Sequence, residues 1–111
     1  MDSVARYREI ICRVLTDLAS ISHSQPGLTS RTVFDRDHDS YLVVTTGWDG
    51  LRRVDQIIAH LDIIDGKIWA QADNTNIGIV RELEEAGVPK HDIVLGFRHP
   101  DVRPLTDYAV A

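Results

Sequence analysis

The chain has 111 residues, of which 43% are hydrophobic, and its formal net charge is −5 at pH 7. This length fits one domain, and the hydrophobic fraction is enough for one core and too high for a disordered chain. No apolar run approaches the roughly 20 residues that a membrane-spanning helix needs. The basic residues are scattered along the chain, so we do not expect it to bind DNA directly by itself.

The N-terminal sequence and the cysteine content indicate a compartment. The first residues lack a basic segment followed by an apolar stretch, so no signal peptide is expected. Cys12 is the single cysteine and cannot form an internal disulfide, which suits a reducing environment. We therefore predict a single cytoplasmic domain that spans residues 1–111, with no contact with a membrane.

Residues 2–20 are predicted to form an amphipathic helix. Its apolar side chains recur at spacings of three and four, at Val4, Tyr7, Ile11, Val14, Leu15 and Leu18. Asp2 or Ser3 can cap the first free amide groups of this helix. The segment 22–30 contains Pro26-Gly27 and is predicted to be a loop.

Four strands are predicted after this loop. They are expected at residues 29–35, 41–46, 54–64 and 67–72, and the second of them is rich in Val and Thr. The gaps between them carry turn sequences, which are Asp37-His38-Asp39-Ser40, Asp49-Gly50 and Asp65-Gly66. Asp-Gly is a favoured centre for a two-residue hairpin. The pattern predicts an antiparallel four-stranded meander, with the first helix packed on one face.

The Asp65-Gly66 hairpin predicts which side chains share a face of the sheet. A two-residue turn sets Ile64 opposite Lys67, and continued pairing sets Ala59 opposite Ala72. One face then carries the apolar side chains, which are Ala59, Leu61, Ile63, Ile68, Ala70 and Ala72. The other face carries a mixed set, which is His60, Asp62, Lys67, Trp69 and Gln71, with Ile64 at the turn. The apolar face is the expected seat of the first helix.

A tight Asp49-Gly50 turn would make the mixed face more apolar. It would place four further side chains there, which are Tyr41, Val43, Val54 and Ile58. A face of that composition is too apolar to be left wholly in water. The sequence leaves open whether the C-terminal segment, the second helix or a partner covers it.

A second, shorter helix is predicted at residues 76–86. Its apolar stripe is Ile79, Leu83 and Ala86, and Asn74, Thr75 or Asn76 can cap it. Gly87 and Pro89 end it. One helical turn is expected at 89–92, then a short buried segment at 93–95 and an irregular tail from residue 99. The predicted fold class is therefore α+β.

His60 and Asp62 are the strongest candidates for chemistry. They stand two apart on one strand face, which would suit two metal ligands, or a base with an orienting carboxylate. A polar outer sheet face is the simpler explanation, because a metal site normally needs three or four ligands. We therefore predict no catalytic residue, metal or cofactor. The alternative is a small enzyme or a nucleotide-binding protein that uses His60 and Asp62.

Two tryptophans point to protein binding. Tryptophan is enriched at binding hot spots, although it is also common in cores. Trp69 falls on the mixed face beside His60 and Asp62. The predicted partner-binding residues are Trp48, Arg52, His60, Asp62, Lys67, Trp69 and Gln71.

Short motifs along the chain resemble one family. They are Tyr7 with Ile10-Ile11, Gly47-Trp48-Asp49 with Arg53, Asp65-Gly66-Lys67-Ile68-Trp69 with Gln71 and Asp73, Glu82-Leu83, Gly87-Val88-Pro89-Lys90, Asp92-Ile93-Val94-Leu95-Gly96-Phe97, and Thr106-Asp107-Tyr108-Ala109-Val110. In this order and spacing they resemble the XisI family, the cyanobacterial excision-controlling factors of the fdxN element. Two positions depart from the family pattern: Asn76 stands where Glu is frequent, and Asp107-Tyr108 stands where Glu-Phe is frequent.

The resemblance implies a non-catalytic controlling factor. In heterocyst-forming cyanobacteria, a DNA element that interrupts a nitrogen-fixation operon is excised during differentiation. A separate recombinase performs the strand exchange, and the implied partner of this chain is an XisH-like protein. A homodimer is a further arrangement that the sequence leaves open. The acidic net charge agrees with action through a protein partner rather than through DNA.

Overall fold

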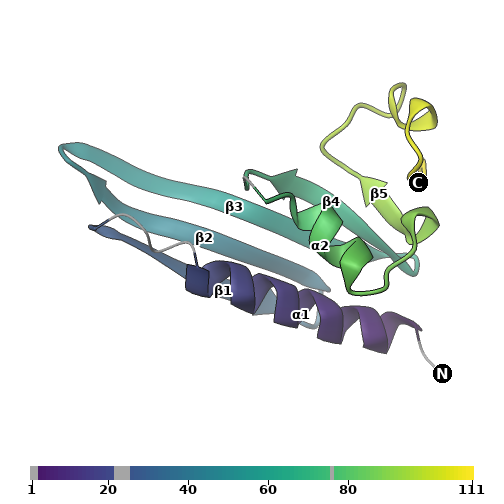
Figure 1. The fold of residues 1–111 in the computed structure, drawn as a ribbon, viewed down its shortest axis with the longest axis horizontal. Helices are drawn as coiled ribbons and strands as arrows, with labels where there is room; N and C mark the ends of the chain where they lie inside the picture. The colour runs from purple at the N-terminus through teal and green to yellow at the C-terminus, as the bar shows by residue number, and fades with distance from the viewer. Residues whose placement is uncertain (1–2, 22–25, 76) are drawn as a thin grey trace.

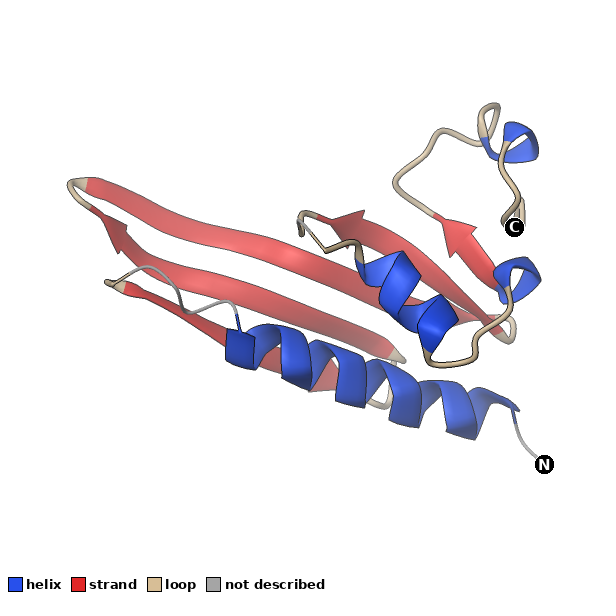
Figure 2. Ribbon diagram, in the orientation of Figure 1, coloured by secondary structure: helices blue, strands red, loops and turns tan. Residues whose placement is uncertain are grey.

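The computed structural model describes residues 3–21, 26–75 and 77–111. Two helices lie on one face of a five-stranded sheet with the strand order β1-β2-β3-β4-β5 (Figure 1). The helices are α1, Ser3–Ile21, and α2, Ile79–Glu85. The strands are β1, Leu28–Asp35, β2, Ser40–Asp49, β3, Arg52–Ile64, β4, Lys67–Asp73, and β5, Ile93–Leu95. Short 3-10 turns at Lys90–Asp92 and Arg103–Leu105 complete the fold (Figure 2).

The α+β class is confirmed, but the prediction of four antiparallel strands is wrong. Strands β1 to β4 form the predicted antiparallel meander, and β5 then pairs with β4 in parallel, with Ile93 beside Ile68. Parallel neighbours need a crossover connection, and α2 provides it. The segment 93–95 was predicted to be buried, but three residues are too few for a strand pattern to be recognised.

The helix and strand boundaries differ from the predictions by a few residues. Helix α1 matches the prediction from Ser3 onward, while Asp2 lies outside the described residues, as do 22–25 in the predicted loop. Helix α2 begins at Ile79 rather than at Asn76, which also lies outside the described residues. The carboxylate of Asp73 accepts a hydrogen bond from the Ile79 amide at 2.9 Å. This acceptor comes from the end of β4, which is why the predicted caps miss it.

The core lies between the helices and one sheet face. The buried stripe of α1 comprises Tyr7, Ile10, Ile11, Val14, Leu15, Leu18 and Ala19. It packs on the apolar sheet face, whose buried members include Tyr41, Val43, Ala59, Leu61, Ile63, Ile68 and Ala70. Burying one large aliphatic side chain contributes about 1.5–3 kcal/mol, so this layer dominates the stability. The predicted seat of α1 is confirmed. No helix among the described residues is both long and apolar enough to cross a membrane.

The predicted register of the β3–β4 hairpin is confirmed near its turn and wrong beyond it. The pairs run from Ile64 with Lys67 to Leu61 with Ala70, as predicted. The register then shifts, so that His60 pairs with Ala72 and Ala59 with Asp73. One extra residue of β4 at Gln71 explains the shift, as in a β-bulge. Leu61 stays on the helix-bearing face, and His60 stays on the other.

The predicted register of the β2–β3 hairpin is wrong. Asp49 pairs with Arg52, so the turn is formed by Gly50 and Leu51 rather than by Asp49-Gly50. Glycine at the first turn position, here with φ +62°, is a preferred arrangement for a two-residue hairpin. This displacement changes the pairing by two residues and leaves every side chain on the same face. The register shift between Val43 and Val44, where Ile58 is an extra residue of β3, brings Tyr41 and Val43 into the core, opposite Leu61 and Ala59.

The other two side chains expected on the mixed face are also elsewhere. Ile58 lies at a register shift in β3 and packs against the core. Val54 is buried and pairs with Gly47, on the side of β2 that also carries Tyr41 and Val43. The face away from the helices is therefore less apolar than predicted.

An ion pair fixes α1 to the β1–β2 hairpin. Arg8 Nε and Nη2 donate to the two carboxylate oxygens of Asp39 at 2.7 and 2.9 Å. Tyr41 Oη donates to the same carboxylate at 2.9 Å. The hydrogen bond from Arg8 is the largest influence that lowers the pKa of Asp39 below its ordinary value. The charged form of Asp39 therefore stabilises the folded state.

We expect Asp39→Asn to lower the free energy of unfolding by about 1–2 kcal/mol at neutral pH. Asparagine tolerates the positive φ of this position, 50°, so the change tests the charge rather than the backbone. A carboxyl with a depressed folded pKa contributes stability above its unfolded pKa and loses it as pH falls through the folded pKa. The difference from the parent chain should thus shrink below about pH 4. Urea titrations at several pH values measure it, and exposed Asp37→Asn, which should be neutral, is the control.

Candidate functional site

The sheet face opposite the helices carries most of the side chains that the sequence singled out. We call it the outer face; its members on β2, β3 and β4 include Ser40, Leu42, Val44, Thr46, Trp48, Arg53, Asp55, Ile57, His60, Asp62, Ile64, Lys67, Trp69 and Gln71. Alternation along paired strands places them together, since each pairs with another member or lies two residues from one. Arg31 and Val33 of β1 extend the same face, because they pair with Val44 and Leu42.

Asp62 is the centre of a polar cluster on the outer face. Its Oδ1 accepts hydrogen bonds from Ser40 Oγ at 2.6 Å and from His60 Nε2 at 2.8 Å. Its Oδ2 accepts one from Gln71 Nε2 at 3.2 Å. The four residues come from β2, β3 and β4, so the cluster ties three strands together. Ser40 was not predicted, because the sequence placed it in a turn rather than opposite Asp62.

The geometry of this cluster does not match a nucleophilic relay. In a Ser-His-Asp relay the carboxylate binds histidine Nδ1, while Nε2 receives the proton of the hydroxyl. Here Nε2 of His60 contacts both Ser40, at 3.2 Å, and Asp62, and the Ser40 hydroxyl donates to Asp62 instead. In the described part of the chain, no three His, Cys, Asp or Glu side chains converge as a metal site requires. The cluster is therefore a hydrogen-bonded polar patch on the sheet surface.

The C-terminal tail covers one end of the outer face. The Arg103 guanidinium lies 5.0 Å from the centre of the Trp69 ring and donates to the Arg98 carbonyl at 3.1 Å. Val94, which pairs with Trp69, is fully buried, and Ala109 donates its amide to Ile93 at 2.9 Å. The sequence left open whether the tail, the second helix or a partner covers this face. The tail lies over its β4–β5 end, and the second helix lies on the opposite face of the sheet.

The tail is tied to α2 by a tyrosine. Tyr108 Oη donates to the carboxylate of Glu84 at 2.7 Å. Burial, with this acceptor, raises the pKa of Tyr108 to about 12. The hydroxyl therefore keeps its proton, and this hydrogen bond, at every pH near neutrality. Neither this contact nor the contact of Arg103 with Trp69 could be predicted, because an irregular segment has no periodicity.

The other end of the outer face is open to solvent. Trp48 is 53% exposed, and Ile57, further along β3 from the turn, is 42% exposed. Val33 is 41% exposed on the same face but lies on β1 at the level of His60, because it pairs with Leu42. The Arg53 guanidinium lies 5.4 Å from the centre of the Trp48 ring, and Arg52 forms an exposed ion pair with Asp49 at 3.5 Å. An exposed aromatic side chain with charged neighbours is typical of a binding surface.

The predicted partner-binding residues fall into two groups. Trp48 and Arg52 lie at the β2–β3 turn, whereas Lys67, Trp69 and the polar cluster lie at the other end of β3. The two groups are about 30 Å apart at ~3.3 Å per residue. The predicted set did not distinguish the two groups, and it omitted Val33 and Ile57, of which Ile57 lies between the groups along β3.

The fold and this face define a class of small α+β protein that presents an exposed sheet surface. The chain matches the family model described as "XisI protein" over residues 1–110, and it belongs to the XisI family. The predicted resemblance is thereby confirmed. No curated protein matches the chain.

Two solved structures are similar to the whole chain. One is an XisI-like protein from Anabaena variabilis ATCC 29413, with 38% identity, a TM-score of 0.90, and coverage of 96% of this chain and 98% of that chain. The other is described as the fdxN element excision controlling factor XisI from the same organism, with 42% identity, a TM-score of 0.85, and coverage of 99% and 100%. The second description names a controlling factor and no enzymatic activity.

Proposed function

We propose that this chain is a non-catalytic controlling factor for site-specific excision of an fdxN-type DNA element during heterocyst differentiation. It acts through protein contacts, with an XisH-like protein as its partner, in the cytoplasm. Its similarity to an fdxN element excision controlling factor over the full length of both chains supports this role. A controlling factor acts through another molecule. The scattered basic residues favour a protein, rather than DNA, as the molecule that this chain contacts directly.

The open end of the outer face carries the proposal. Trp48 and Ile57 are more than two-fifths exposed there, and Val33 on β1 adds a third exposed apolar side chain to the same sheet face. Interfaces commonly have an aromatic centre and a polar rim. Trp48 is the proposed anchor and Arg52 part of the rim. The second group, His60, Asp62, Lys67, Trp69 and Gln71, extends the surface toward the tail.

Complex formation tests the proposed function. The full chain and an XisH-like protein, each purified separately, are mixed at micromolar concentration and examined by size-exclusion chromatography with light scattering. We expect a mixed complex. Two unchanged elution peaks over the whole concentration range would contradict the proposal. If the chain alone elutes as a dimer and no mixed complex forms, the outer face would be assigned to self-association instead.

We expect no measurable binding of duplex DNA by the isolated chain at physiological salt. The reason is the acidic net charge of −5, since phosphate contacts require clustered Lys and Arg. A gel-shift titration to micromolar protein measures it, with the XisH-like protein alone and the mixture in parallel lanes. A salt-dependent shift by the isolated chain would overturn the expectation, because salt dependence reports phosphate contacts.

A further inference from the structure

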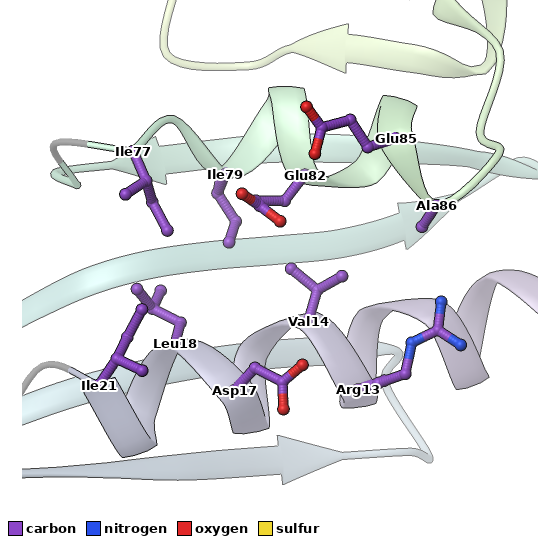
Figure 3. Close-up of a pocket in the computed structure, with 10 residues that line it drawn as sticks. All are labelled: Arg13, Val14, Asp17, Leu18, Ile21, Ile77, Ile79, Glu82, Glu85 and Ala86. Atoms are coloured by element: carbon purple, nitrogen blue, oxygen red, sulfur yellow. The ribbon is translucent and has the colours of Figure 1, made fainter.

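A groove lies on the helix side of the sheet, away from the outer face. It is a cavity of about 300 Å³ between α1 and α2 (Figure 3). Val14 and Leu18 of α1 and Ile79 of α2 line it with apolar surface. Because the proposed partner surface is on the opposite face of the sheet, this groove is a separate site.

The apolar lining continues into solvent at one end of the groove. Ile21, the last residue of α1, is 65% exposed, and Ile77, just before α2, is 44% exposed. Both line the cavity together with Leu18. Large aliphatic side chains line this groove and remain exposed. A partner that covers them is stabilised in the complex, because apolar surface is removed from water.

The rim of the groove is acidic. Asp17, Glu82 and Glu85 line it, against a single basic side chain, Arg13. Glu85 is paired with Arg81 at 3.3 Å, whereas neither Asp17 nor Glu82 forms an ion pair within the described ranges. Two carboxylates beside exposed aliphatic surface favour a ligand that is both apolar and cationic.

We propose that this groove binds a basic amphipathic helix of a protein partner. Aliphatic side chains spaced three or four residues apart on that helix would cover the apolar lining, and flanking Lys or Arg would meet Asp17 and Glu82. From Val14 to Ile21 the groove follows α1 for about 10 Å, which matches two turns of a docked helix. A small cation could satisfy the carboxylates but could not cover apolar surface over that length. A chain with partner sites on both sides of its sheet can hold two proteins at once.

A synthetic peptide provides the probe. It is a labelled helix of about 14 residues with leucines at spacings of three and four and lysines elsewhere, since shorter helices are marginal in water. Fluorescence anisotropy with the full chain should show saturable binding. A peptide with glutamate in place of each lysine should not bind. A peptide with serine in place of each leucine should lose at least about tenfold in affinity.

Paired charge reversals locate the site. We expect Asp17→Lys with Glu82→Lys to weaken binding about tenfold or more. Asp37→Lys with Asp101→Lys changes the net charge equally at exposed positions outside both helices and the groove lining, and should change binding less than about twofold. Melting curves confirm that both variants fold. Trp48→Ala should leave peptide binding unchanged, so failure here is distinguishable from failure of the outer-face proposal.

Four results would overturn the proposal. They are the absence of saturable binding, an equal loss in both charge-reversal variants, full displacement of the peptide by equimolar spermine, and self-association of the chain that only Asp17→Lys with Glu82→Lys abolishes. The second would show attraction to overall charge alone. The third would assign the groove to a small polycation, and the fourth to a second copy of the chain.

Discussion

We expect Trp48→Ala to weaken the complex with an XisH-like protein by about 2 kcal/mol or more, as at other aromatic hot spots. The melting temperature should change little, because the ring is 53% exposed and the Arg53 side chain beside it is also exposed. Isothermal titration calorimetry of the purified proteins measures the affinity. Unchanged affinity with a folded variant would remove the open end of the outer face from the proposed interface.

Trp69→Ala tests the second group of the proposed surface. Trp69 is half-buried beneath Arg103, so its removal should lower the free energy of unfolding by about 2 kcal/mol, less than for a fully buried aromatic ring. A loss of affinity larger than this loss of stability explains would extend the interface to the polar cluster around Asp62.

We expect Gly47→Ala to lower the free energy of unfolding by about 3 kcal/mol. Gly47 has φ +142°, and a Cβ atom at this position would lie 2.0 Å from the Gly27 carbonyl oxygen. That oxygen is backbone immediately before β1 and accepts a hydrogen bond from the Trp48 amide at 3.0 Å. The two strands would therefore have to separate where they position Trp48.

Urea denaturation measures this loss, and Gly50→Ala is its control. Gly50 has a positive φ, +62°, but nothing lies within 4 Å of the Cβ position. Its substitution should cost only the backbone strain, about 1–2 kcal/mol. Equal losses at Gly47 and Gly50 would show that φ alone, rather than the close approach of Gly27, requires glycine at residue 47. Gly47→Ala should also weaken partner binding if Trp48 is the anchor.

Turn chemistry explains which parts of the fold could be predicted. Asp65-Gly66 forms the expected turn, so the pairs down to Leu61 and Ala70 follow from the sequence. The bulge at Gln71 leaves no sign in the hydrophobic pattern. At the other hairpin the turn is displaced by one residue, to Gly50-Leu51, and a bulge at Ile58 moves Tyr41 and Val43 to the opposite face.

The site was predictable only as far as local alternation reaches. His60, Asp62 and Trp69 share a face because they lie on one short hairpin, and the structure places them together. Ser40 and Arg103 join them from segments distant in the sequence, so no spacing rule finds them. Trp48 and Trp69 lie toward opposite ends of β3, because Trp48 pairs with Arg53 and Trp69 pairs with Asp62.

The bridge between Val94 and Ala109 covers one edge of the sheet, that of strand β5. An edge strand presents amide and carbonyl groups on which a foreign strand can assemble, and proteins commonly blunt such edges by covering them. At β5 the Ile93 carbonyl already accepts the Ala109 amide, so the tail occupies the position that an incoming strand would take. Strand β1 forms the opposite border. Growth of the sheet by recruitment of another chain, whether in a regulated assembly or in aggregation, is therefore directed to β1.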